Sequence, residues 1–350
     1  MVHLAQSQKL EDFDYTIQQE GKVFYEQWLD RNQWKYGQFH STNHKDSIIQ
    51  IVPNIIGMPI AAYRNGIGTN WKVESYDKTW TLPDYKPFKK YKFDFWLQPD
   101  FQLKFGNFEK PVESKGGISI YHQIPILRGL SLFAGLHIPV TNDFDEQPLT
   151  IRPAPTYFNY FKSFLKYNFL NIAGGYFLGD RYGYKIQYIK SPLDQAWSWG
   201  VENSLTGYLY FYPKSLKYTP LDNLVLLGHL AYRLKKEDIT FKLTGGQFLH
   251  QDKGARLDLI RQFSKAEVSL FSLFSQNGST IGIELAFRIP PGKLIQSRNF
   301  RLRTGNEYPF QYIYSSGFSI AENFRLLTDM DRMLRQFNSN YWINESYRVK

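Results

Sequence analysis

Charged side chains that could act in pairs recur in the second half of the chain, on the polar side of alternating segments. Four carboxylates stand there among cations and one amide: Lys185, Gln187, Glu202, Lys242, Arg256, Asp258, Glu267, Glu284 and Arg288. Two carboxyl groups that flank a sugar are the catalytic groups of most glycoside hydrolases, and one of them must be protonated. Neighbouring cations favour the ionised form instead. We therefore interpret the set as ion pairs facing the lumen of a β-structure, and we predict no catalytic residue and no enzyme activity.

The chain offers little for metal, cofactor or nucleophilic chemistry. It has no cysteine, which excludes disulfides and thiolate ligands. His40 and His44 are four residues apart, but they lie in a polar stretch without the flanking pattern of a zinc site. A Gly-x-Ser-x-Gly motif is absent, and no glycine-rich loop has the spacing that phosphate binding needs. We predict neither a metal nor a cofactor.

Alternation of apolar and polar residues predicts the elements that carry the polar set. From Ile281 to Ile289 every second residue is apolar, and the residues between them include Glu284 and Arg288. Successive side chains of a strand point to opposite faces. The same period returns at 182–188 and 239–244. Each strand must therefore present one face to apolar surroundings and the other to polar ones.

About twelve such strands follow one another within residues 91–291, with no convincing helix between them. Short turns alternate with longer polar loops at 141–155 and 213–223, which is typical of outer-membrane barrels. We predict an all-β fold, an antiparallel transmembrane β-barrel of about twelve strands. Residues 1–90 are expected to form a small N-terminal periplasmic domain or a plug.

Residues 292–350 are expected to form a separate C-terminal segment. Within it, Ser319–Phe337 carries apolar residues three and four apart, which predicts an amphipathic helix. Its opposite face holds Asp329, Arg332 and Arg335. We expect this helix to pack against the mouth of the barrel, with a position on the membrane surface as the alternative.

Composition restricts the partners. No apolar run reaches the roughly 18 residues of a membrane-spanning helix, and the mean hydropathy is -0.43. A barrel is compatible with both values because only every second residue of a strand faces lipid. The net charge of +10 suits anionic partners. Its lysines and arginines are scattered and accompany no nucleic-acid-binding motif, so we predict outer-membrane lipid and no nucleic acid as a partner.

Aromatic residues make up 17% of the chain. Those near predicted strand ends are Trp96, Trp197, Trp199, Tyr208, Tyr210 and Tyr212. Amphipathic rings at strand ends form interfacial belts at the level of the lipid headgroups. We predict that these six belong to such belts, with stacking on sugar rings as the alternative.

The first residues bear on the location of the protein. Met1–Gln8 lack the basic start and the apolar core of a secretory signal. Leu4 and Ala5, followed by Gln6, look like the tail end of such a signal. We expect a protein of the cell outer membrane whose signal peptide is missing or truncated here, while an ordinary N-terminus is the alternative.

Three segments resemble signatures of the YjbH family. Tyr176–Val201 contains a turn into a strand, a break rich in Pro and Asp, and then Trp-Ser-Trp-Gly. Gly245–Phe263 is similar to a second signature, a hairpin that leads into a strand, and Gly282–Pro290 is similar to the closing strand. The resemblance implies an outer-membrane barrel linked to exopolysaccharide or capsule production, with polysaccharide and other export proteins as partners. It implies no catalytic residue.

Three functions follow from these patterns. The first is a non-catalytic outer-membrane barrel that assists exopolysaccharide or capsule export or surface assembly. The second is a general porin or small-solute channel. The third is a soluble glycan-binding or glycan-cleaving β-protein, in which Ile281, Ile283, Leu285 and Phe287 would face a protein core.

Overall fold

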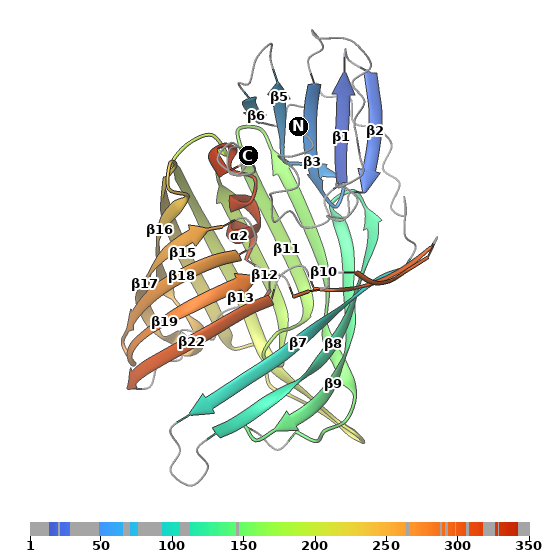
Figure 1. The fold of residues 1–350 in the computed structure, drawn as a ribbon. Coiled ribbons are helices and arrows are strands. Elements are labelled where there is room, and N and C mark those ends of the chain that lie inside the picture. Colours follow the sequence, from blue (N-terminus) through green and yellow to red (C-terminus); the bar gives the residue numbers. More distant parts are fainter. Residues whose placement is uncertain are drawn as a thin grey trace.

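Two β-sheets make up the computed structural model (Figure 1). The structure describes residues 14–19, 22–28, 49–65, 71–75, 93–105, 112–144, 147–263, 266–287, 289–290, 293–297, 299–305, 308–317, 326–327 and 329–341. The predicted signal remnant, His40, His44 and Arg288 lie outside these ranges, as does the predicted domain boundary near residue 91. Among the described residues, no helix is both long and apolar enough to span a membrane.

The small sheet lies at the N-terminus and has the order β2-β1-β3-β5-β6, with β4 paired to β3. Its strands are β1 (Asp14–Gln19), β2 (Lys22–Trp28), β3 (Ile49–Ile55), β4 (Met58–Pro59), β5 (Ala61–Asn65) and β6 (Trp71–Ser75). All of its pairings are antiparallel. Residues predicted to form a small domain or a plug therefore form a sheet of their own.

The large sheet has the order β20-β21-β7-β8-β9-β10-β11-β12-β13-β15-β16-β17-β18-β19-β22, with β14 paired to β13. Its first strands are β7 (Phe93–Phe105), β8 (Val112–Leu127), β9 (Leu130–Asn142), β10 (Arg152–Phe164), β11 (Asn168–Phe177), β12 (Arg181–Lys190), β13 (Trp197–Tyr212) and β14 (Ser215–Tyr218). The rest are β15 (Asn223–Leu234), β16 (Ile239–Gln247), β17 (Lys253–Gln262), β18 (Ala266–Ser275), β19 (Gly278–Phe287), β20 (Lys293–Gln296), β21 (Phe300–Thr304) and β22 (Tyr308–Gly317). The prediction of a mainly antiparallel β fold is confirmed.

The large sheet extends past the boundary predicted at residue 291, because β22 pairs with β19. The sequence of β22 hides this, since Pro309 is its second residue and four of its residues, Tyr308, Phe310, Tyr312 and Tyr314, are aromatic. Twelve successive antiparallel pairings lead from β7 to β22. Because this number is even, β7 and β22 run in the same direction. β21 pairs in parallel with the start of β7 and antiparallel with β20. Among the described residues no ladder joins β22 to β7, and closure into a barrel is not detected.

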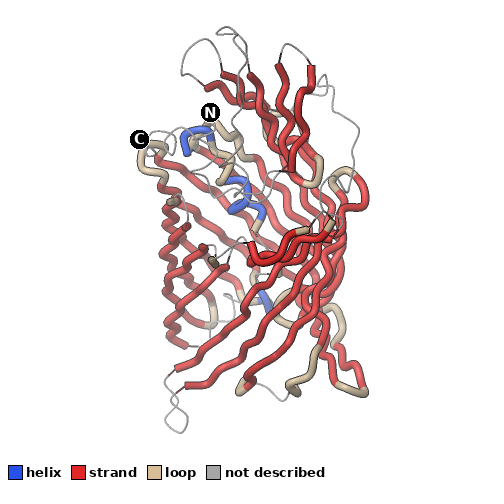
Figure 2. Tube along the Cα trace, turned by 45° about the vertical axis from the view of Figure 1, so that its right-hand side comes forward, coloured by secondary structure: helices blue, strands red, loops and turns tan. Residues whose placement is uncertain are grey.

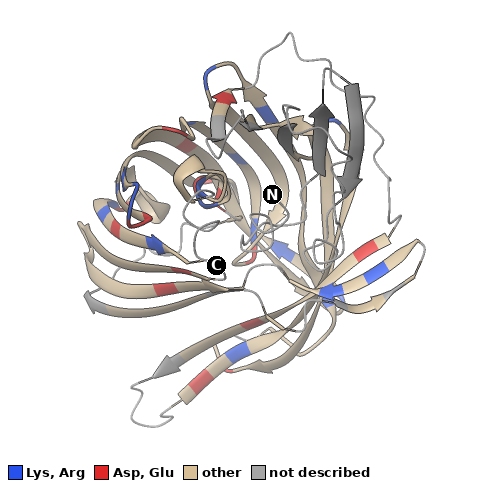
Figure 3. Cartoon of the chain, turned by 45° about the horizontal axis from the view of Figure 1, so that its top comes forward, with Lys and Arg blue, Asp and Glu red and all other residues tan. Residues whose placement is uncertain are grey.

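The sheet curls strongly, and its concave side encloses the C-terminal helix α2 (Met330–Arg335) (Figures 2 and 3). A glycine permits the close approach of β12 and β13. Gly183 has φ +143°, and a Cβ there would lie 2.1 Å from the carbonyl oxygen of Leu205. At Gly174, on the neighbouring strand β11, a Cβ would lie 3.8 Å from its nearest atom, which is ordinary van der Waals contact.

The polarity of the large sheet is the reverse of that of a water-soluble protein. In β17, the polar Arg256 and Asp258 are buried while Leu257 and Leu259 are exposed. In β19, Glu284 is 1% exposed and Ile281 is 56% exposed. The alternation predicted from the sequence is therefore present, with its polar side buried on the concave face and its apolar side on the convex face.

An apolar core joins the small sheet, the large sheet and the C-terminal residues. Ile60 and Tyr63 of the small sheet pack with Phe161 and Phe169 of the large one and with Phe337. The Tyr63 hydroxyl donates a hydrogen bond to the Phe337 carbonyl. We call the end of the large sheet that carries this core the junction end; it includes the turns after β10, β12 and β17.

Candidate functional site

The structure gathers eight of the nine predicted lumen-facing residues on the concave face of the large sheet, and the ninth, Arg288, is outside the described residues. They come from six strands: Lys185 and Gln187 from β12, Glu202 from β13, Lys242 from β16, Arg256 and Asp258 from β17, Glu267 from β18 and Glu284 from β19. All are buried or nearly so. The strand alternation explains this placement, because each residue lies on the polar side of its strand.

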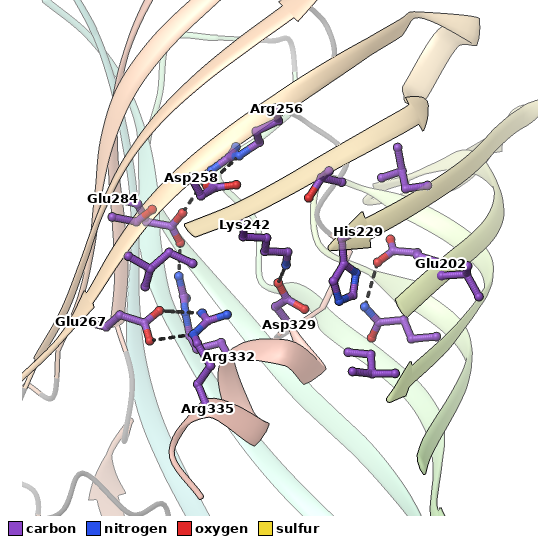
Figure 4. Close-up of a pocket in the computed structure, with 17 residues that line it drawn as sticks. Glu202, His229, Lys242, Arg256, Asp258, Glu267, Glu284, Asp329, Arg332 and Arg335 are labelled. Carbon is purple, nitrogen blue, oxygen red and sulfur yellow. Dashed lines mark hydrogen bonds and ion pairs between the residues drawn. The ribbon is translucent and has the colours of Figure 1, made fainter. Parts of the chain in front are cut away.

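Helix α2 packs against this charged surface and adds charged side chains of its own (Figure 4). Lys242 Nζ lies 2.9 Å from an Asp331 carboxylate oxygen and 3.3 Å from one of Asp329. Arg332 Nε lies 3.0 Å from Glu267 Oε1, and its guanidinium also pairs with Glu284. Four strands of the sheet wall and the helix thus form one ion-pair network, with Glu267 also bound by Arg335 at 2.9 Å.

Other ion pairs lie within the wall itself. Lys185 Nζ is 2.8 Å from Glu202 Oε1, and the Gln187 amide donates to the other oxygen of Glu202. Arg256 donates twice to Asp258, at 2.9 and 2.8 Å. Its guanidinium also lies 3.8 Å from the centroid of the Phe271 ring, a cation–π contact. These carboxylates are thus partnered by cations or amides rather than held as a free acid and base.

The charges on α2 keep each other ionised. Burial would raise the pKa of Asp331, but Arg335 and Lys242 outweigh burial and hold that pKa well below its ordinary value. Burial would lower the pKa of Arg335, but Asp331 and Glu267 together raise it above its ordinary value. The helix therefore stays charged, and locked to its partners, throughout the neutral range.

Little space remains between helix and wall. The cavity there has a volume of about 40 Å³ and is lined by both. Three buried polar atoms that face it, Gln187 Oε1, His229 Nε2 and Ser269 Oγ, have no hydrogen-bond partner among the described residues. At ~10–15 Å³ per water site, a few ordered water molecules suit this space and these atoms. No group of three or more potential metal ligands occurs within the described part of the chain.

The C-terminal residues cross the whole concave space. We call Leu326, Leu327 and residues 329–341 the C-terminal strap. The Leu178 amide, in the turn after β11, donates to the Leu326 carbonyl at 3.2 Å. The Ser339 amide donates at 2.8 Å to the Leu193 carbonyl, in the turn after β12. Since these two turns flank β12 at opposite ends, the strap runs along the length of that strand.

The sequence-based prediction for this segment needs correction. The helix was expected over Ser319–Phe337, but α2 covers Met330–Arg335, and residues 318–325 lie outside the described ranges. Asp329 has extended backbone angles and caps the helix, its carboxylate accepting a bond from the Asp331 amide. Arg332 and Arg335, which lie on the predicted polar face, are buried because wall carboxylates receive them.

The six aromatics predicted to form a belt separate into two groups. Trp197 and Trp199 are exposed on the convex face. Trp96 instead shares the concave face with Asp94, and Arg303 lies 5.1 Å from its ring. Tyr208 accepts a bond from buried Arg181 and its ring stacks on Tyr210, and Tyr212 lies under Lys217. Cationic partners thus hold Trp96 and Tyr208 away from the outer surface.

Sequence reasoning missed the buried charges that join distant parts of the chain. Asp94 of β7 receives Arg301 Nε at 2.9 Å and Arg303 Nε at 3.2 Å, which fastens β21 to β7. Arg332 and Arg335, three residues apart on one helix face, are a signal that could have indicated an acidic receptor.

Comparisons with protein-family models, curated proteins and solved structures find no match to this chain.

Proposed function

We propose that this chain is a non-catalytic outer-membrane β-barrel protein that assists the export or surface assembly of an extracellular polysaccharide. The observation that carries the membrane part is the reversed polarity of the large sheet. Leu230, Leu243 and Leu257 stand side by side on three neighbouring strands, and all three are exposed. Water would oppose this arrangement, whereas lipid favours it at about 25 cal/mol for each Å² of apolar surface removed from water.

Strand length supports the same proposal. A tilted strand needs about 9–11 residues to cross a bilayer. The shortest wall strand, β16, has 9 residues, and the longest, β8 and β13, have 16. Closure of the barrel would bring β7 and β22 together in parallel, and β7 already has one parallel neighbour, the short β21, at the junction end.

We assign the junction end to the periplasm. It carries the small sheet, and its turns after β8 and β10 are short. The opposite end holds the longer connections from β9 to β10 and from β13 to β15 through β14, in line with the long outer loops of bacterial barrels. The connection from β19 to β22, which carries β20 and β21, lies at the junction end.

The polysaccharide role follows from the resemblance to the YjbH family and from the crowded interior. The cavity of about 40 Å³ between α2 and the wall has room for a few water molecules, so α2 fills this side of the interior. An accessory or scaffold role beside a separate export channel suits such an interior better than a permanently open pore. The same crowding disfavours a general porin.

The soluble glycan-binding alternative required Ile281, Ile283, Leu285 and Phe287 to face a protein core. Ile281 and Ile283 are 56% and 42% exposed, and no described residue covers them. This exposure favours the membrane proposal over the soluble one.

Fractionation with a heat-modifiability test examines the proposal. The chain is expressed in a Gram-negative host behind a signal peptide, and boiled and unboiled samples are compared by electrophoresis. We expect recovery in the outer membrane and a mobility shift on boiling. Soluble recovery without detergent would contradict the membrane role. Deletion in the native host with unchanged surface polysaccharide would contradict the polysaccharide role alone.

A further inference from the structure

We propose that the C-terminal strap is a displaceable plug, whose release from the wall opens the concave interior. The consequence of this release for transport rests on the proposed function. The plug itself is argued from contacts alone, and it can be tested without a membrane.

One face of α2 meets the wall through ionic contacts. Lys242, Glu267 and Glu284 of the wall meet Asp331, Arg332 and Arg335 of the strap, and all these side chains are at most 11% exposed. Desolvation offsets most of the attraction in a buried ion pair, so such pairs fix a position without adding much stability.

The helix cannot hold itself in place. With six residues, α2 is far below the ~12–15 residues at which an isolated helix becomes even marginally stable in water. Its structure therefore depends on the wall and on the Asp329 cap. Loss of the ion pairs would free the charged face of the helix from β16, β18 and β19, while Met330 and Leu334 hold its other face.

The two ends of the strap are attached unequally. At the junction end, Met330, Leu334, Phe337 and Tyr341 belong to the apolar core that all three parts of the protein share. At the other end, Leu326 and Leu327 pack in a smaller cluster with Ala173 and Phe177 of β11 and Tyr157 of β10. Release is thus expected to begin at the Leu326 end, while the junction end stays anchored.

A single engineered cysteine reports the release. Ser269 is 4% exposed, lines the cavity beneath α2 and lies two residues from Glu267 on the same face of β18. The chain has no native cysteine, so Ser269→Cys is the only thiol. The full chain is purified in detergent and treated with a small maleimide, and the labelling rate is compared with that of Ser215→Cys on exposed β14.

Strap variants are then made in the Ser269→Cys background. We expect Arg332→Gln to raise the labelling rate at least tenfold, because it removes the cation shared by Glu267 and Glu284. Glu267→Gln alters the same contact from the wall and is an independent second variant should the first fail to fold. The matched control, Asp94→Asn, breaks a buried pair with Arg301 away from the strap and should leave the rate unchanged.

Each outcome decides the matter. Slow labelling in the unaltered strap and fast labelling in folded Arg332→Gln or Glu267→Gln support the plug. Rates that stay slow in both variants would overturn it, as would a Ser269→Cys rate equal to that of the exposed thiol. Failure of the outer-membrane test would leave this readout intact, so the two proposals can fail separately.

Discussion

An arginine on the convex face tests the lipid contact directly. Leu243 is the central residue of β16, is 52% exposed and lies between Leu230 and Leu257. If this row faces the bilayer midplane, Leu243→Arg should reduce the free energy of unfolding by about 2–4 kcal/mol. If the row faces water, a surface substitution should change it by no more than about 0.5 kcal/mol. The two environments therefore predict clearly different values.

A residue on the same face but nearer the membrane surface serves as the matched control. Leu224 lies on the same face, one residue from the end of β15, where an arginine should cost only about 0–1 kcal/mol. Both variants are folded into lipid vesicles and titrated with guanidinium chloride, with the folded fraction read from the mobility of unboiled samples. A loss of about 2–4 kcal/mol corresponds to roughly a 30- to 1000-fold fall in the folding equilibrium constant. Equal stabilities for Leu243→Arg and Leu224→Arg would refute the lipid-facing assignment.

Three further predictions concern the interior, the curl and the junction. Because the pKa of Asp331 is depressed in the folded state, its stabilisation is complete above the unfolded value of about 4 and is lost as the pH falls further. In guanidinium titrations, the difference in unfolding free energy between the unaltered chain and Asp331→Asn should therefore stay constant from pH 7 to about 4 and shrink only below that. Gly183→Ala should destabilise the fold by about 1–3 kcal/mol, as measured by guanidinium titration. Gly174→Ala is its control, and an equal effect of the two substitutions would contradict the close approach of Gly183 to the neighbouring strand. Tyr63→Phe removes the bond to the Phe337 carbonyl and should cost about 1 kcal/mol in the same titration; an unchanged midpoint would show that this bond adds nothing to the junction.

Much of the large sheet could be predicted from the sequence because strand alternation is a local property. Glu284 follows Ile283 and precedes Leu285, so the two faces separate whichever strands lie alongside. That pattern also placed Lys242 and Arg256 on one side before their neighbours were known. The strand β22 escaped prediction because its alternating residues are mostly aromatic and give no clear polar face.

Sequence by itself thus determined the strands, their faces and the presence of many charges on the concave side. Only the tertiary structure decided what those charges meet. Arg332 reaches Glu267 across 65 residues, and Arg301 reaches Asp94 across 207. No local pattern encodes such pairs, because each ion could be satisfied by water until the curled sheet removes water from its interior. The C-terminal strap lies inside the sheet for that reason: the buried wall carboxylates need cations, and the strap supplies them.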